Sequence, residues 1–266
     1  AAPNDDGPDT ISLVSPRTNP GWTLSTVVPV SPATSFTAIT LNAAAVAEMQ
    51  AEGMADNSNA YVSIGGVVTG QVTTSSSATV NLNSTYNLPM TFPSGTQVYL
   101  LQCITYSIGT TAAACGTNGP CLLRTVDTGT APTTTTNIVD GVEDIQFALA
   151  CDGCNTTIKS GVPDGVIDDW NADNTFDALD WQTNRVWAPL TFDPATIRLV
   201  QVNVVARQTT ADQGLGEKQQ AGILTAAPLT VSDHLHSADP GYALPTYQQF
   251  RRRVLTRTVD ARNVEQ

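Results

Sequence analysis

The chain has 266 residues, of which 41% are hydrophobic and 14% are charged, and its formal net charge is −12. The length suffices for one large β-rich domain or two small ones, and the aliphatic content excludes a disordered chain. The excess of 24 acidic over 12 basic residues argues against nucleic acid as the main partner.

The first half of the chain predicts short strands around one helix. The helix is expected over residues 41–52, where Asn42 can cap its N-terminus and Gly53 can end it. Its apolar stripe consists of Ala45, Val46 and Met49. Strands are expected at residues 10–14, 61–68, 78–82, 98–106 and 121–126. The stretch 98–106 is apolar on both faces, which is typical of a central strand.

The second half predicts an antiparallel sheet built from residues 145–150, 196–207 and 250–263. In the second of these stretches β-branched residues alternate, and one face consists of Val200, Val202, Val204 and Ala206. No helical crossover separates the three stretches, so antiparallel pairing is expected. Apolar residues at helical spacing predict one helical turn at 138–144. The fold class is therefore α+β and β-rich, with long loops.

The five cysteines indicate two disulfides with short loops. Cys115 and Cys121 bracket a turn-rich loop, and Cys151 and Cys154 form a CxxC pair. We expect both pairs to be oxidised and Cys103 to be a buried thiol. A zinc site at the CxxC pair would need four ligands, and neither a second CxxC nor a nearby histidine is present.

An acidic loop over residues 151–181 is a candidate cation site. Asp164, Asp168 and Asp169 crowd beside Gly165, which permits a tight turn. Ca²⁺ takes six to eight oxygen ligands at such short spacing, so a calcium site is one interpretation. The spacing departs from DxDxDG and no Glu follows at the twelfth position, which favours a solvated acidic loop over calcium.

Four arginines near the end are unusual in so acidic a chain: Arg251, Arg252, Arg253 and Arg257. On a strand Arg251 and Arg253 would share one face, and Arg252 would point the opposite way. They could protect a sheet edge, pair with the acidic loop, or dock an acidic neighbouring subunit. The net charge disfavours DNA binding.

Catalysis finds little support in the sequence. The only two histidines, His234 and His236, lie in an irregular stretch, residues 208–249, where we expect them to be exposed to solvent. Asp233 is a neighbour of His234 in sequence and not an orienting partner in space. No Walker loop, GxGxxG, GxSxG or HExxH motif is present. The sequence predicts a protein that is not an enzyme, and a metal role for the histidine pair is disfavoured.

An ordered set of segments resembles the PilW family of type IV pilus assembly. The resemblance is carried by IVDGVEDIQFALACD, IRLVQVNVVARQ and YQQFRRRVLTRTVDARN. Upstream segments agree with it, namely TISLV, TLNAAAVAEM, AYVSIGG, GTQVYLLQCITYSI and CLLR, so it covers most of residues 9–263.

The resemblance implies a single pilin-like domain over residues 1–266, with a β-rich part at 9–136 and the core sheet at 137–266. It implies a minor pilin of the initiation or tip complex, which primes pilus assembly and could present an adhesin. The implied partners are other minor pilins, the major pilin and a PilY-type tip adhesin. The implied location is an inner-membrane-anchored protein with a periplasmic domain, which becomes extracellular in the pilus.

The family's basic leader and hydrophobic N-terminal helix have no counterpart in the chain, which opens with a polar, Asp-rich tail. We therefore expect a periplasmic domain whose membrane contact would come only through that helix. The alternative is a secreted β-domain that binds carbohydrate or a surface ligand. Trp22, Trp170 or Trp181 exposed in a groove would favour it. A secreted hydrolase is disfavoured.

Overall fold

The computed structural model describes residues 7–17, 21–29, 35–56, 60–87, 91–129, 133–154, 162–183, 196–211, 228–239 and 241–261. The chain divides into two compact units. Unit 1 consists of Ala1–Thr10, Ser107–Leu123 and Asn137–Gln266, and unit 2 consists of Ile11–Tyr106 and Arg124–Thr136. All strand pairs with a described register are antiparallel, which confirms the expected β-rich class. The prediction of one domain over the whole chain stays a prediction.

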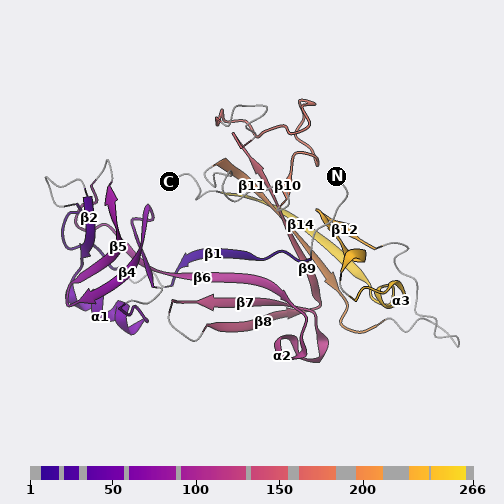
Figure 1. Ribbon diagram of the computed structural model, residues 1–266, viewed down its shortest axis with the longest axis horizontal. Coiled ribbons are helices and arrows are strands. Elements are labelled where there is room, and N and C mark those ends of the chain that lie inside the picture. Colours follow the sequence, from indigo (N-terminus) through magenta and orange to yellow (C-terminus); the bar gives the residue numbers. More distant parts are fainter. Residues whose placement is uncertain are drawn as a thin grey trace. The chain divides into compact units, whose positions relative to one another are not determined.

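Unit 1 contains a four-stranded sheet in the order β10-β9-β11-β14. Its strands are β9 (Val142–Cys151), β10 (Gln182–Thr183), β11 (Ile197–Arg207) and β14 (Arg252–Asp260). Strand β11 lies between β9 and β14 (Figure 1). Val204 stands opposite both Ile145 and Leu255 in the strand register. This arrangement confirms the predicted pairing of the three stretches.

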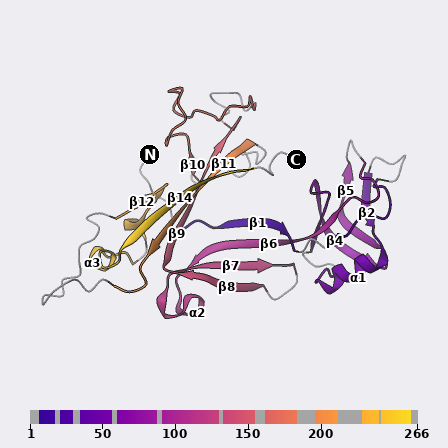
Figure 2. The same cartoon turned by 180° about the vertical axis from the view of Figure 1, so that it is seen from behind.

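A C-terminal segment packs against one face of this sheet. It consists of β12 (Thr230–Val231), β13 (His234–Leu235), the 3-10 helix η3 (His236–Ala238) and α3 (Leu244–Tyr247). Figure 2 shows β12 and α3 beside the sheet. His234 and His236 both reach Asp144 of β9. The register places further buried side chains on the same face as Asp144, namely Gln146, Asn203 and Val205. The stretch 208–249, which the sequence suggests is irregular, therefore contains ordered elements in its described part.

The predicted helical turn at 138–144 is wrong. The chain instead passes from strand β8 (Thr134–Asp140) into β9, and Gly141 forms the turn between them with φ +81°. That φ lies in the left-handed region, which a right-handed helical turn cannot contain. The Gly141 N–H donates to the carbonyl of Pro120, and its own carbonyl accepts from Arg207. The neighbouring β-branched residues favour the strands on either side.

Strand β8 belongs to a larger sheet with the order β2-β5-β4-β3-β6-β7-β8, in which β1 also pairs with β6. Its other strands are β1 (Ile11–Pro16), β2 (Ser35–Thr40), β3 (Tyr61–Ile64), β4 (Val68–Ser76), β5 (Thr79–Asn87), β6 (Val98–Gly109) and β7 (Cys121–Asp127). The central position expected for residues 98–106 is confirmed. The single strand expected at 61–68 is wrong, because Gly65 and Gly66 adopt positive φ and turn the chain from β3 into β4.

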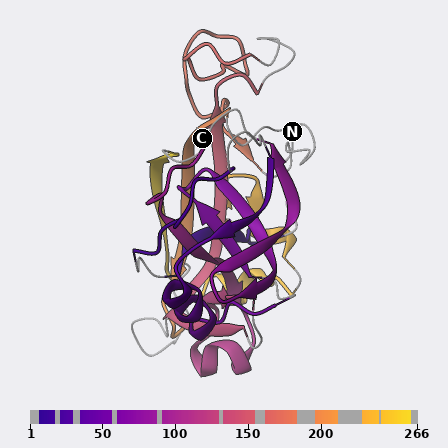
Figure 3. The same cartoon turned by 90° about the vertical axis from the view of Figure 1, so that its left-hand side faces the viewer.

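The predicted helix is confirmed as α1 (Ala43–Ala51). Asn42 Oδ1 accepts hydrogen bonds from the N–H groups of Ala44 and Ala45, which is the expected N-terminal cap. Its stripe of Ala45, Val46 and Met49 is buried in the hydrophobic core of unit 2. Figure 3 shows α1 as the indigo coil at the near end of this unit. Among the described helices, none has the length and apolar character needed to span a membrane.

Candidate functional site

The cysteines pair as the sequence indicates. Cys115 and Cys121 form one disulfide around α2 (Ala112–Cys115) and η1 (Gly116–Asn118), and Cys151 and Cys154 form the other. Cys103 is the free cysteine. It is half-buried, so the expectation of a buried thiol is wrong. The reason is that Cys103 lines a pocket.

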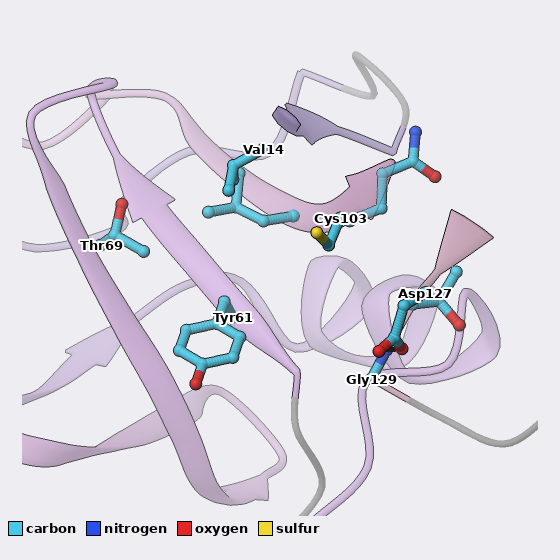
Figure 4. Close-up of a pocket in the computed structure, with 9 residues that line it drawn as sticks. Val14, Tyr61, Thr69, Cys103, Asp127 and Gly129 are labelled. Carbon is cyan, nitrogen blue, oxygen red and sulfur yellow. Dashed lines mark hydrogen bonds between the residues drawn. The ribbon is translucent and has the colours of Figure 1, made fainter. Parts of the chain in front are cut away.

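This pocket lies within unit 2 and has a volume of about 520 Å³. Figure 4 shows Val14, Tyr61, Cys103 and Asp127 around it, contributed by β1, β3, β6 and β7. Val14 is 69% exposed and Tyr61 is 42% exposed. Sequence reasoning missed the pocket because its lining comes from strands far apart in the chain.

The acidic loop is organised around two buried carboxylates. Asp152 accepts hydrogen bonds from the N–H groups of Asp164 and Gly165 and forms an ion pair with Arg198 at 3.1 Å. Asp180 accepts from the N–H groups of Trp170 and Asp177. Neither aspartate was among the predicted site residues. Both draw the loop together by binding its backbone.

The three candidate calcium ligands serve separate turns of the same loop. Asp164 accepts from the N–H of Val166, and buried Asp168 accepts from the N–H of Gly153. Asp169 accepts from the N–H groups of Ala172 and Asn174. Within the described ranges, the groups of three side chains close enough to share a metal ion do not include this trio. The solvated loop therefore stays the prediction that we prefer over a calcium site.

We expect millimolar calcium to leave the melting temperature unchanged, because these carboxylates already accept backbone hydrogen bonds. Thermal unfolding followed by circular dichroism, with calcium and with chelator, measures the effect. Calcium at about a hundredfold above its Kd would stabilise the folded state by roughly 2.7 kcal/mol. A rise that chelator reverses and Asp168→Ala abolishes would contradict our expectation and establish the calcium site.

The four arginines have different environments. The Arg252 side chain is only 4% exposed, donates to both carboxylate oxygens of Glu143, and stacks 3.4 Å from the ring centroid of Tyr247. Its partner is therefore Glu143, and not the acidic loop. Arg251, Arg253 and Arg257 are exposed. Arg252 points away from Arg253, as the strand alternation predicts.

One side of β11 and β14, which we call the β11–β14 face, combines apolar and basic side chains. It consists of Val200, Val202, Val204, Ala206, Arg253, Leu255, Arg257 and Val259, as the strand register shows. The three valines of β11 are half-buried, whereas Leu255 is 59% exposed and Val259 is 54% exposed. The face therefore leaves apolar surface uncovered at the β14 edge.

The histidines are buried, which corrects the expectation that they are exposed. His234 Nδ1 lies 2.9 Å and His236 Nε2 lies 3.1 Å from Oδ2 of Asp144, and His234 Nε2 lies 2.6 Å from Oδ1 of Asp239. Burial alone would lower the pKa of His234, but the carboxylates of Asp144 and Asp239 raise it to about 9. Burial alone would raise the pKa of Asp144, but hydrogen bonds from both histidines and Gln146 lower it to about 2.

Sequence reasoning missed Asp144 as the partner of both histidines. One sequence signal could have indicated such a partner. Glu143 and Asp144 lie at the start of an apolar strand, and a carboxylate that is buried with such a strand needs a hydrogen-bonding or charged partner. Asp233 is also buried, but among the described residues no hydrogen-bond donor reaches its carboxylate. This agrees with the prediction that Asp233 does not orient His234.

The tryptophans give little support to a ligand groove. Trp22 is 4% exposed, and its indole N–H donates to Glu48. Trp170 and Trp181 are half-buried, and the Trp181 ring lies 5.4 Å from that of Phe176. Trp22 therefore belongs to the core of unit 2 and is not available to a carbohydrate.

Comparison with known proteins gives one match. A family model for PilW, described as Type IV Pilus-assembly protein W, matches residues 105–263, which is more than half of the chain. The matched range contains the four-stranded sheet, both disulfides and both histidines. No curated protein and no solved structure matches the chain.

Proposed function

This chain belongs to the PilW family of type IV pilus-assembly proteins, and from that premise we propose that it is a minor pilin without enzymatic activity. Its role would be to prime pilus assembly within the initiation or tip complex and to help present an adhesin. Its partners would be other minor pilins, the major pilin and a PilY-type tip adhesin. It would be anchored in the inner membrane and later become extracellular in the pilus.

The observation that carries this proposal is the β11–β14 face. Half-buried Val200, Val202 and Val204 continue into exposed Leu255 and Val259 at the edge of the sheet. Arg253 and Arg257 alternate with these two side chains along β14. Such a surface is stabilised by an apolar partner that excludes water. An amphipathic helix is the partner that a pilin fold would supply, because its apolar stripe matches a flat sheet face. We therefore propose that an N-terminal pilin helix would pack on this face.

We expect the double variant Leu255→Asp, Val259→Asp to lose surface pili when the two substitutions are introduced into the gene on the chromosome. Each buried aliphatic side chain contributes about 1–1.5 kcal/mol at such a contact, so losing both weakens it by roughly 30–150-fold. Pili sheared from the cells and quantified against whole-cell protein give the measurement.

Thr258→Asp is the matched control, because Thr258 lies on the opposite side of the same strand. It should leave piliation intact. The isolated 266-residue chain should melt at the same temperature with either set of substitutions, since these side chains are exposed in it. Normal piliation by the double variant would contradict the proposed role of the face.

The alternative, a secreted β-domain that binds carbohydrate, receives no comparable support. Of its three candidate tryptophans, Trp22 is buried in the core of unit 2, and Trp170 and Trp181 are half-buried. Loss of carbohydrate binding with intact piliation, on deletion of the gene, would decide for that alternative.

A further inference from the structure

The buried histidine cluster of unit 1 has the composition and spacing of a metal centre. The ligand atoms of Asp144, His234 and His236 all lie within 4.8 Å of one another. Their side chains are 0%, 1% and 3% exposed, respectively. Ligands of a tetrahedral ion with bonds of about 2.0–2.1 Å are separated by roughly 3.3 Å. The observed separations of 2.9 and 3.1 Å from Asp144 Oδ2 need only a small opening to admit an ion.

Each of these three side chains is also oriented by a second partner. His234 Nε2 lies 2.6 Å from Asp239 Oδ1, and His236 Nδ1 lies 3.5 Å from Glu143 Oε1. Asp144 Oδ1 accepts a hydrogen bond from Gln146 Nε2 at 3.0 Å. Histidines that bind metals almost always have such a carboxylate or carbonyl on the other ring nitrogen, which fixes the ring and the nitrogen that faces the ion.

The charges around the cluster favour a cation. The charge of Glu143 is offset by Arg252 and by Arg207, which lies 3.8 Å away, although Glu143 also faces His236. The negative charges of Asp144 and Asp239 face the histidines. Asp233 adds a buried carboxylate next to His234 in the chain, with no hydrogen-bond partner among the described residues. A divalent ion would displace the proton that His234 shares with Asp144 and would offset the carboxylates in its place, with the imidazoles neutral.

We propose that His234, His236 and Asp144 bind one divalent transition-metal ion, with zinc as the reference ion. Two imidazole nitrogens and one carboxylate oxygen suit zinc, whereas calcium and magnesium prefer oxygen ligands alone. Because Asp144 belongs to β9 and the histidines belong to β13 and η3, the ion joins the C-terminal segment to the sheet. This role is independent of the proposed pilus function.

The test uses the oxidised chain, stripped of metal with chelator and titrated with zinc sulfate alone. We expect one equivalent to bind and the melting temperature to rise through preferential binding to the folded state. The chain has only two histidines, so nitrogen-15 spectra of the imidazoles report the site without any substitution. Zinc should shift the signals of His234 Nδ1 and His236 Nε2, the nitrogens that face Asp144.

Substitutions separate the ligands from their surroundings. His236→Gln should abolish binding of the one zinc equivalent. Asp239→Asn should weaken the affinity for zinc by about 10–100-fold, as expected for a side chain that orients a ligand. Asp173→Asn, in the exposed acidic loop, is the matched control and should bind zinc unchanged. Unshifted imidazole signals in the wild-type protein would overturn the proposal, as would zinc uptake that His236→Gln leaves intact.

Discussion

Replacing Arg252 by alanine should destabilise unit 1 by about 3–4 kcal/mol, because it breaks a buried ion pair. The Arg252 guanidinium donates to both oxygens of Glu143 and to the carbonyl oxygens of Tyr247 and Phe250. All of these acceptors lose a charged donor in the variant, and the Tyr247 ring loses its stacked cation. Urea unfolding followed by circular dichroism gives the free-energy difference.

Arg253→Ala is the matched control, since Arg253 is the next residue on the same strand but is exposed. It should change the free energy of unfolding by no more than about 0.5 kcal/mol. Arg252→Lys should fall between the two, because an ammonium group cannot form the two parallel hydrogen bonds of a guanidinium. Similar small losses for Arg252→Ala and Arg253→Ala would show that the ion pair contributes nothing net.

Replacing Asp152 by asparagine should destabilise unit 1 by about 2–3 kcal/mol at pH 7, because a buried charge-assisted network is lost. The Asp152 side chain is 0% exposed, and its two oxygens accept from the N–H groups of Asp164 and Gly165 and from Arg198. An asparagine amide nitrogen cannot accept at one of these positions. The variant therefore leaves a donor of the acidic loop unsatisfied.

The loss of stability in Asp152→Asn should depend on pH. Burial alone would raise the pKa of Asp152, but the N–H groups of Asp164 and Gly165 together with Arg198 lower it below its ordinary value. A carboxylate with a lowered folded pKa stabilises the protein fully above its unfolded pKa of about 4, and this contribution disappears as pH falls through the folded pKa. The difference between wild type and Asp152→Asn should thus be largest near neutral pH and should shrink in acid.

Urea unfolding of both proteins at neutral and at acidic pH measures this difference directly. Asp173→Asn provides the control, because Asp173 lies in the same loop but is exposed. Its free energy of unfolding should differ little from that of the wild type at either pH. A penalty for Asp152→Asn that stays constant from neutral to acidic pH would contradict the assignment of the effect to the carboxylate charge.

Local patterns in the sequence were sufficient for the elements whose conformation neighbouring residues decide. The alternating β-branched residues of 196–207 identified β11, because extended chains place alternate side chains on opposite faces and β-branched residues favour them. Asn42 identified the start of α1, because its side chain caps the first turn. The short spacings identified both disulfides, because Cys115 and Cys121 flank a single turn-rich loop and Cys151 and Cys154 form a CxxC pair.

Glycine conformations were decided by the tertiary structure. The apolar spacing around Gly141 fits a helical turn as well as two strands, and the contacts of Gly141 with Pro120 and Arg207 select the strands. Gly65 and Gly66 interrupt one apolar stretch in the same way. Glycine permits both outcomes, since it adopts positive φ at little cost, so local sequence does not distinguish them.

The pairing of charged residues was also beyond local sequence. Asp144 lies 90 residues before His234, and Glu143 lies 109 residues before Arg252. Each pair forms only because the C-terminal segment folds back onto β9 and β14 pairs with β11 in one register. Composition and spacing thus determined the fold class and the sheet strands, whereas the partners of Asp144, Glu143 and Arg252 depended on which distant segments the fold brings into contact.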